Sequence, residues 1–169
     1  VTALRAYWVN GGPIWHRGLK GDTDLERQVH NWYHYIWLCA DHIVEQHVHN
    51  IDVCNWVVNA HPVKAWGMGS RQQLGNKPGE IWDNFSVEFE YANGVRMQSF
   101  CGQIKRDFGS VSEAVVGSKG TSNPAGQIRP KDGPAWRAPN KKLSEYVYEH
   151  IDLINAIVKD TPLNETEQV

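Results

Sequence analysis

The stretch DNFSVEFEYANGVRMQSFCGQI (residues 83–104) constrains the fold of this chain more than any other segment. Apolar and polar side chains alternate from Phe85 to Tyr91, which predicts a strand with one apolar and one polar face. Asn93-Gly94 is the strongest two-residue signal for a tight hairpin turn, and a second strand-like run follows it. We therefore expect a β-hairpin that belongs to a sheet with one face on the core.

Other helical and strand-like patterns surround this hairpin without the regular alternation of a βαβ fold. Helices are expected in three places: a short one from Asp24, capped by Asp22 or Thr23, a long one from Asp41 to Asn59, and an amphipathic one over 143–157. Further strands are expected at 3–9, 63–69 and 110–117, with loops at 10–22, at 71–80 and, where four prolines occur, at 122–140. This order predicts an α+β fold, with an open, largely antiparallel sheet and helices on one of its faces.

The composition narrows the classes of protein and partner. A chain of 169 residues corresponds to about one domain and can bury a sizeable core. The net charge of -2 gives no field that attracts nucleic acid or an anionic membrane, and no apolar run is long enough to cross a bilayer. Three cysteines without CxxC spacing are expected to be reduced and buried.

Two glycine-containing segments match nucleotide-binding motifs only in part. Gly67-Met68-Gly69 follows a predicted strand, but it lacks a third glycine and leads into a polar loop instead of a helix. The segment GSKGT (residues 117–121) does not have the order GxxxxGK[ST] and fits a tight turn between strands. We expect no nucleotide site within this chain.

The segment from His42 to Val58 contains the candidate functional residues. If it is one α-helix at about 100° per residue, a polar stripe forms within about 80° of arc. The stripe consists of His42, Glu45, His49, Asp52 and Trp56. His47 falls in the middle of the opposite, apolar side, and we interpret it as a core histidine satisfied by a hydrogen bond.

Three interpretations of the stripe remain open. One is a solvated helix face, although such faces usually carry lysine and arginine, and histidine is the only cation here. A second is acid–base chemistry, because a carboxylate four residues before a histidine, such as Glu45 before His49, can orient the ring. A metal site is disfavoured, since His42 and His49 are about 10.5 Å apart along a helix axis. We favour acid–base chemistry and expect no metal ligands.

Several motifs resemble one family of enzymes. His49-x-x-Asp52 with an acid at position 45 resembles the D-x-G-x-H-x-x-D helix of the glucose–fructose oxidoreductase / inositol dehydrogenase / MocA (Gfo/Idh/MocA) family. Glu45 replaces the family's Asp, and His47 stands where Gly is common. Segments that look like a bacterial subgroup of its dehydrogenases are RAYW, RQVHNWYHYIWL, DHIVEQHVHNIDVCNWV, HPVKAWGMGSRQ, FEYANGVRMQSFC and VVGSKGT.

This resemblance implies that the chain is one half of a two-domain enzyme. In the family, an N-terminal Rossmann domain binds NAD or NADP and contributes a lysine from an E-K-P motif. A C-terminal α+β domain supplies the substrate pocket and the oligomer surface. Residues 1–169 resemble only that second domain as a single unit, and they are expected to lack the family's last helix. Alone, the chain is expected to bind no nicotinamide cofactor and to be inactive.

The resemblance also implies roles for individual residues. His49 matches the histidine that exchanges a proton with the substrate hydroxyl as hydride moves to or from the nicotinamide, and Glu45 matches its acidic partner. The residues expected to bind substrate are Asp52, Asn31, Trp32 and His42. The leading hypothesis is an NAD(P)-dependent oxidoreductase acting on a secondary hydroxyl of a sugar or cyclitol.

Two alternative functions follow from the same features. A glycosidase of this architecture would oxidise its sugar only transiently and release no NADH, whereas a non-catalytic oligomerisation module would leave the polar stripe solvated. In every case we expect a homo-oligomer formed through the exposed sheet face, with no nucleic-acid or membrane partner. The sequence does not determine the localisation, although a cytoplasmic protein is favoured over a periplasmic one.

Overall fold

The computed structural model of the protein describes residues 1–162, apart from residues 13, 14, 16, 17, 19, 106, 107 and 141. The strands are β1 (Ala3–Val9), β2 (Pro62–Ser70), β3 (Asn84–Tyr91), β4 (Arg96–Gly102), β5 (Ser110–Gly117), β6 (Gly120–Asn123), β7 (Gln127–Pro130) and β8 (Trp136–Arg137). The helices are α1 (Asp24–His30), α2 (Ile36–Cys39), α3 (His42–Glu45), α4 (Val48–Val58) and α5 (Glu145–Val158), with a short 3-10 helix η1 (Trp32–His34). The loop expected at 10–22 lies partly outside the described residues.

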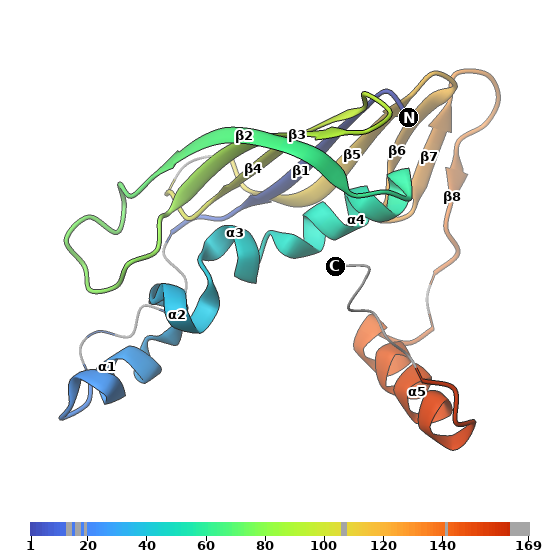
Figure 1. The fold of residues 1–169 in the computed structure, drawn as a ribbon. Helices are drawn as coiled ribbons and strands as arrows, with labels where there is room; N and C mark the ends of the chain where they lie inside the picture. Colours follow the sequence, from blue (N-terminus) through green and yellow to red (C-terminus); the bar gives the residue numbers. More distant parts are fainter. Residues whose placement is uncertain (13–14, 16–17, 19, 106–107, 141, 163–169) are drawn as a thin grey trace.

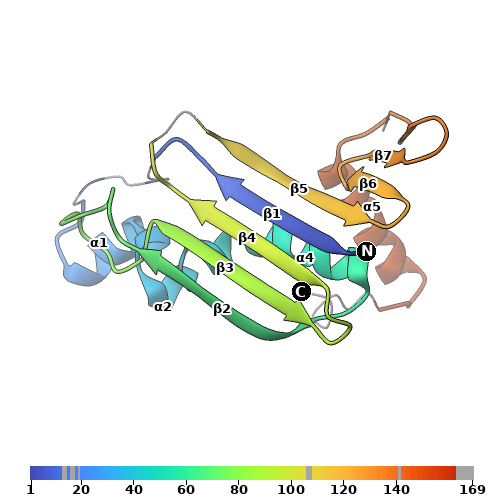
Figure 2. The ribbon, with the colours of Figure 1, turned by 90° about the horizontal axis from the view of Figure 1, so that it is seen from above.

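The eight strands form one open, largely antiparallel sheet, which confirms the predicted fold class. Their order is β2-β3-β4-β1-β5-β6-β7-β8, so the first strand of the chain lies in the middle. β1 and β4 run parallel, and the other neighbouring pairs are antiparallel. The helices lie on one side of the sheet (Figure 1), and the view from above shows the opposite face without a helix over it among the described residues (Figure 2).

The predicted hairpin forms β3 and β4. In its turn, the Gly94 amide donates to the Tyr91 carbonyl oxygen over 2.9 Å. Gly94 has a φ of +81°, in the left-handed region that glycine adopts without strain. Phe89 on β3 lies opposite the buried Met97 on β4, on the helix side of the sheet. The polar residues that alternate with the apolar ones along β3 face the outer side. The alternation of apolar and polar side chains therefore identified the two faces correctly.

The core lies between α4 and the middle of the sheet. Leu4 on β1 lies between its strand partners Met97 on β4 and Val115 on β5. These three side chains are buried, and the fully buried Cys54 of α4 belongs to the same cluster. All three cysteines are free and buried, as the sequence predicts. The packing fixes α4 beneath β1, with one side of the helix turned away from the sheet.

Residues 122–140 are not a single loop, which corrects the prediction. This segment contains β7, β8 and the end of β6, which extend the sheet beyond β5 as short antiparallel strands. Pro124 lies in the turn between β6 and β7, and Pro130 ends β7, both of which are positions where a sheet tolerates proline. The strands are largely exposed, so they lack the apolar alternation that would have revealed them.

The helix predictions are confirmed at both ends of the chain and wrong in the middle. The Thr23 hydroxyl caps α1 by accepting a hydrogen bond from the Glu26 amide, and the Glu26 carboxylate accepts one from the Thr23 amide. α5 forms as expected and stands apart from the sheet in Figure 1. The long helix expected at 41–59 is instead two helices, α3 and α4. Among the described residues, no helix has the length and apolar character needed to span a membrane.

Candidate functional site

The helix expected to contain the functional residues is interrupted between Glu45 and Val48. α3 ends at Glu45, and Gln46 adopts a φ of -112° and a ψ of -45°. The His47 amide donates to the His42 carbonyl oxygen over 3.3 Å, five residues back instead of four. Because the break shifts the residues before it relative to those after it, the continuous polar stripe does not form.

His47 lies in the core, which confirms its interpretation. The side chain has no exposed surface, its Nε2 lies 2.7 Å from the Ser99 hydroxyl, and its Nδ1 lies 3.3 Å from the Asn50 side-chain oxygen. Because an amide oxygen only accepts, we assign the proton to Nδ1, so that Nε2 accepts from Ser99. Burial lowers the pKa of His47 to about 4, and the ring is therefore neutral near pH 7.

His42 also lies inside the protein, which corrects its placement on an exposed stripe. Its Nδ1 is 2.5 Å from the Tyr33 hydroxyl, and its ring packs edge-on against Trp8 of β1, with centroids 5.1 Å apart. Burial, and then the neighbouring His47, lower the pKa of His42 to about 4. The side chain is 0% exposed, so in this structure it has no surface that could contact a substrate.

His49, Asp52 and Trp56 form the side of α4 that faces away from the sheet. Their spacing of three and then four residues places them on one helix face. The sheet-facing side is marked by the buried Asn50 and Cys54. His49 is exposed, Asp52 is partly exposed and the Trp56 indole is 75% exposed. This face combines an accessible imidazole, a carboxylate and an aromatic ring, so it can exchange a proton with a bound molecule.

Glu45 ends α3 and is partly exposed. Burial raises the pKa of Tyr33, and the charges of Cys39 and Glu45 add to this effect. Within the part of the chain that the structure describes, no hydrogen bond or ion pair joins Glu45 to His49. The break in the helix therefore leaves Glu45 at the end of α3 and His49 in α4, on two separate helices.

The two residues predicted to bind substrate ahead of α2 differ in accessibility. Asn31 is 3% exposed, and its side-chain amide donates to the carbonyl oxygens of Gly18 and Arg27 over 2.6 and 3.2 Å, which ties the preceding loop to α1. Trp32 is partly exposed, and its ring lies 5.7 Å from that of Trp15, which is 47% exposed. The two indoles form an aromatic surface of the kind that packs against sugar rings.

Asp41 is an important residue near the site that the sequence did not single out. One carboxylate oxygen accepts from the His42 amide over 2.6 Å, and the other accepts from the Trp82 amide over 3.1 Å. The side chain thereby caps α3 and ties it to the segment before β3. Burial raises the pKa of Asp41, although these two hydrogen bonds oppose the rise. An aspartate directly before a helix is a typical N-cap signal, which would have identified it.

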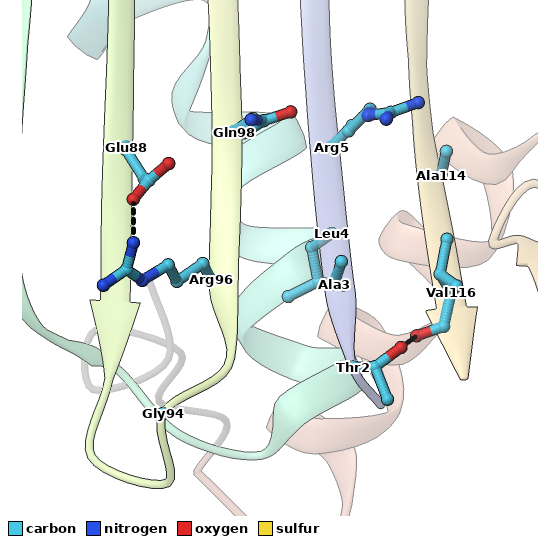
Figure 3. Close-up of a pocket in the computed structure, with 10 residues that line it drawn as sticks. All are labelled: Thr2, Ala3, Leu4, Arg5, Glu88, Gly94, Arg96, Gln98, Ala114 and Val116. Carbon is cyan, nitrogen blue, oxygen red and sulfur yellow. Dashed lines mark hydrogen bonds and ion pairs between the residues drawn. The ribbon is translucent and has the colours of Figure 1, made fainter. Parts of the chain in front are cut away.

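The outer face of the sheet carries a shallow hollow of about 380 Å³ over β1, β3, β4 and β5 (Figure 3). Arg96 donates to the carboxylates of Glu88 and Glu90 over 3.0 and 3.1 Å. Arg5 lies between its strand partners Gln98 and Ala114, neither of which is acidic. This face lies on the other side of the sheet from α4, and its central arginine has an uncharged residue on each side.

The described residues include no turn suited to a nucleotide. Gly67 lies inside β2, where an added Cβ would collide with the Ser86 carbonyl oxygen of β3. Gly117 and Gly120 flank the turn between β5 and β6, and neither segment leads into a helix N-terminus. Neither segment therefore offers the glycine-rich turn into a helix that binds the phosphates of NAD or NADP. In the same described part of the chain, no three His, Cys, Asp or Glu side chains gather as a metal site.

Comparison with known proteins identifies the class of enzymes to which this fold belongs. A model of the GFO/IDH/MocA C-terminal domain matches residues 16–123, which is more than half of the chain. The chain therefore belongs to the Gfo/Idh/MocA family of oxidoreductases and corresponds to the C-terminal domain. A search of the curated proteins finds no match.

Solved structures share the fold. The aldose–aldose oxidoreductase of Caulobacter crescentus, crystallised with glycerol, matches with a TM-score of 0.65 and 15% identity over 94% of this chain and 46% of that chain. The myo-inositol 2-dehydrogenase of Lactobacillus plantarum matches with a TM-score of 0.64 and 16% identity over 99% of this chain and 50% of that chain. The WlbA dehydrogenase of Bordetella pertussis, in complex with NADH and UDP-GlcNAcA, matches with a TM-score of 0.60 and 13% identity over 95% of this chain and 45% of that chain. At these identities the likeness establishes the fold, and the chain spans about half of each protein.

Proposed function

We propose that this chain is the substrate-binding and catalytic half of an NAD(P)-dependent oxidoreductase acting on a secondary hydroxyl of a sugar or cyclitol. The observation that carries the proposal is the accessibility of His49. Of the three histidines between Asp41 and Asn59, two are fully buried and neutral, and only His49 is exposed, on a helix face turned away from the sheet. Asp52 lies on that same face, one turn later.

In this proposal, His49 accepts the proton of the substrate hydroxyl. Asp52 lies three residues further along α4, where its carboxylate can hydrogen-bond a neighbouring substrate hydroxyl or stabilise the imidazolium that forms. Glu45 adds a second negative charge at the end of α3. When bound, the nicotinamide supplies the acceptor for the hydride that leaves the substrate carbon bearing this hydroxyl. The exposed rings of Trp15 and Trp32 offer an apolar surface for the sugar ring.

The proposal assigns cofactor binding to a second domain of the full-length protein. It is supported by the lack of a suitable turn in the described residues and by the neighbours, each about twice as long as this chain. WlbA was crystallised with NADH, and GenD2, from gentamicin A biosynthesis, was crystallised with NAD. Sugar-related substrates are named for several neighbours, which favours the same substrate class here.

The test replaces His49 in the full-length protein. Purified wild type, His49→Ala and His49→Gln are assayed with NAD⁺ and NADP⁺ against a panel of aldoses, inositols and UDP-sugars, and reduced cofactor is measured by absorbance. Loss of a general base should lower turnover by about 10³-fold. His61→Ala, at an exposed histidine just after α4, serves as the control and should keep wild-type turnover. Near-normal turnover of His49→Ala would refute the assignment. Cleavage of a nitrophenyl glycoside without NADH release would identify the glycosidase instead.

We further propose that two copies of the protein associate through the outer face of the sheet. Among the described residues no helix covers this face, and β1, β4 and β5 present Arg5 beside Gln98 and Ala114 without a carboxylate partner in register. Towards the β2 edge, the side chains of Trp66 and Met68 are 44% and 79% exposed. An uncovered sheet face with apolar side chains at one edge is typical of a surface that pairs with another copy.

A further inference from the structure

We propose that His42 and His47 are positioning residues that hold the helix open between α3 and α4, and that this break sets how Glu45 and His49 are presented to a substrate. The inference rests on the proposed function of His49. It extends that function to two imidazoles that have no exposed surface and therefore touch no ligand.

The directions of the His42 and His47 side chains are incompatible with a continuous helix. In an uninterrupted α-helix, residues five apart point about 140° away from each other. Two such side chains cannot both be buried against one sheet. Here the His42 ring packs against Trp8 of β1, and His47 bonds to Ser99 of the neighbouring strand β4. Burying both imidazoles therefore requires the chain to open between them, as the bond from the His47 amide to the His42 carbonyl oxygen shows.

The anchor of His47 is built across three strands. Ala6 on β1 has Ser99 on β4 as its partner on one side and Glu113 on β5 on the other, so the three residues form a row. Ala6 is fully buried, and its small side chain leaves space above the row. The side chains of His47 and Asn50 lie over this row, where they contact Ser99 and Glu113.

Three hydrogen bonds run along that row. The Ser99 hydroxyl donates to His47 Nε2 over 2.7 Å, and His47 Nδ1 donates to the Asn50 oxygen over 3.3 Å. The Asn50 amide then donates to Glu113 over 2.5 Å. Breaking one link would leave a buried polar group unpaired, which costs about 1–3 kcal/mol, so the start of α4 is held firmly in place.

A separate anchor holds His42 on the other side of the break. Its Nδ1 bonds to the hydroxyl of Tyr33, which is itself fully buried. The backbone of Tyr33 is fixed in turn, because the Cys39 thiol donates to its carbonyl oxygen over 3.0 Å. Asp41 adds the N-cap of α3. The two halves of the interrupted helix are therefore fastened independently, one to the aromatic segment and one to the sheet.

The break lies directly between the two proposed functional side chains. Glu45 is the last residue of α3, and His49 is the second residue of α4. If either anchor were lost, the segment could close into a continuous helix, which would rotate the Glu45 and His49 side chains relative to each other. A misplacement of about 1 Å in an active site can cost on the order of 10²-fold in rate.

The test separates positioning from simple stability. His47→Phe keeps a ring and removes both hydrogen bonds, whereas His47→Asn keeps the donor to Asn50. Cys54→Ala, at a fully buried residue of α4, is the matched control for lost packing. In the full-length protein, kcat and KM are measured with the most active compound of the sugar and cyclitol panel. The ring nitrogen signals of His49 are recorded by NMR.

We expect His47→Phe to lower kcat by about 10- to 100-fold with little change in KM, and to shift the His49 signals. His47→Asn should restore part of kcat. Cys54→Ala should lower the melting temperature without either change. Equal kcat in His47→Phe and Cys54→Ala at matched stability would overturn the inference, as would unshifted His49 signals in His47→Phe. If His49→Ala keeps its activity, or if no compound of the panel is turned over, the proposed function fails and kcat cannot report on the position of His49. The NMR signals of His49 in His47→Phe then decide whether His47 positions that residue.

Discussion

At the scale of single residues, burial distinguishes the exposed His49 from the two other histidines of this segment, His42 and His47. His47 could be assigned to the core because it interrupts the apolar side of a helical pattern, and the structure confirms that assignment. His42 could not be placed in the same way, because its environment depends on Tyr33 and Trp8, which the helical periodicity does not include. The exposed His49 and Asp52 remain the residues we propose for chemistry.

The two buried histidines predict how the stability depends on pH. Their pKa values are lowered from 6.5 to about 4 in the folded protein, so the unfolded chain binds more protons between these values. The free energy of unfolding should therefore fall by about 1.4 kcal/mol per pH unit for each histidine as the pH drops from about 6.5 to about 4.

Chemical denaturation at several pH values across this window measures the slope. His47→Asn should remove about half of the contribution, because one titrating group is lost from the unfolded state. Cys54→Ala changes the packing but not the number of buried imidazoles, so it should shift the curve without changing its slope. A slope in His47→Asn equal to that of wild type would rule out the explanation.

At the scale of elements, the strands with regular alternation were predictable and the irregular ones were not. The patterns around residues 3–9, 63–69 and 83–117 identified β1 to β5, because these segments are rich in apolar residues, which in β1 and β4 alternate between a buried and a more exposed face. The short strands β6 to β8 contain no buried residue and few apolar side chains, so they leave no such pattern. The break between α3 and α4 depends on anchors such as Ser99, which is 52 residues from His47 in sequence, so local periodicity could not reveal it.

The N-cap of α3 gives a prediction at this scale. Asp41→Ala removes the acceptors for the amides of His42 and Trp82 and should destabilise the protein by about 1–3 kcal/mol. Asp41→Asn keeps one side-chain oxygen for the His42 amide and should cost less. Urea denaturation of the two variants and wild type measures the difference. Thr23→Ala, which removes a cap from the exposed helix α1, is the control and should cost about 1 kcal/mol. Equal stability of Asp41→Ala and wild type would show that this cap has no structural role.

At the scale of the whole molecule, the sheet separates the face proposed for catalysis from the face proposed for association with a second copy. The helix side carries α4 and His49, and the outer side carries the hollow around Arg5 and Arg96 (Figure 3). The composition predicted a single unit of this size, but side-chain alternation alone does not reveal whether a polar sheet face meets solvent or another copy. The proposed association therefore needs a measurement of its own.

Reversing the charge at the middle of the outer face tests that association. If two copies pack through this face, Arg5→Glu brings like charges and an unpaired carboxylate into the contact, which costs several kcal/mol. The dissociation constant should rise by at least about 100-fold, as measured by light scattering and sedimentation of the full-length protein. Lys105→Glu, an exposed charge in the loop after β4, is the control and should leave the assembly intact. An unchanged assembly in Arg5→Glu would exclude this face.

The central position of β1 also governs the order in which the chain can fold. Ala3 pairs with Arg96 on one side and with Val116 on the other, so both edges of β1 stay unpaired until two strands much later in the sequence have been made. Such long-range pairings close large loops and slow folding, whereas the β3–β4 hairpin closes over a few residues and can form early. While this domain is synthesised, β1 therefore stays unpaired until β4 and β5 have been made, and α4, which carries the proposed chemistry, cannot pack on the middle of the sheet before then.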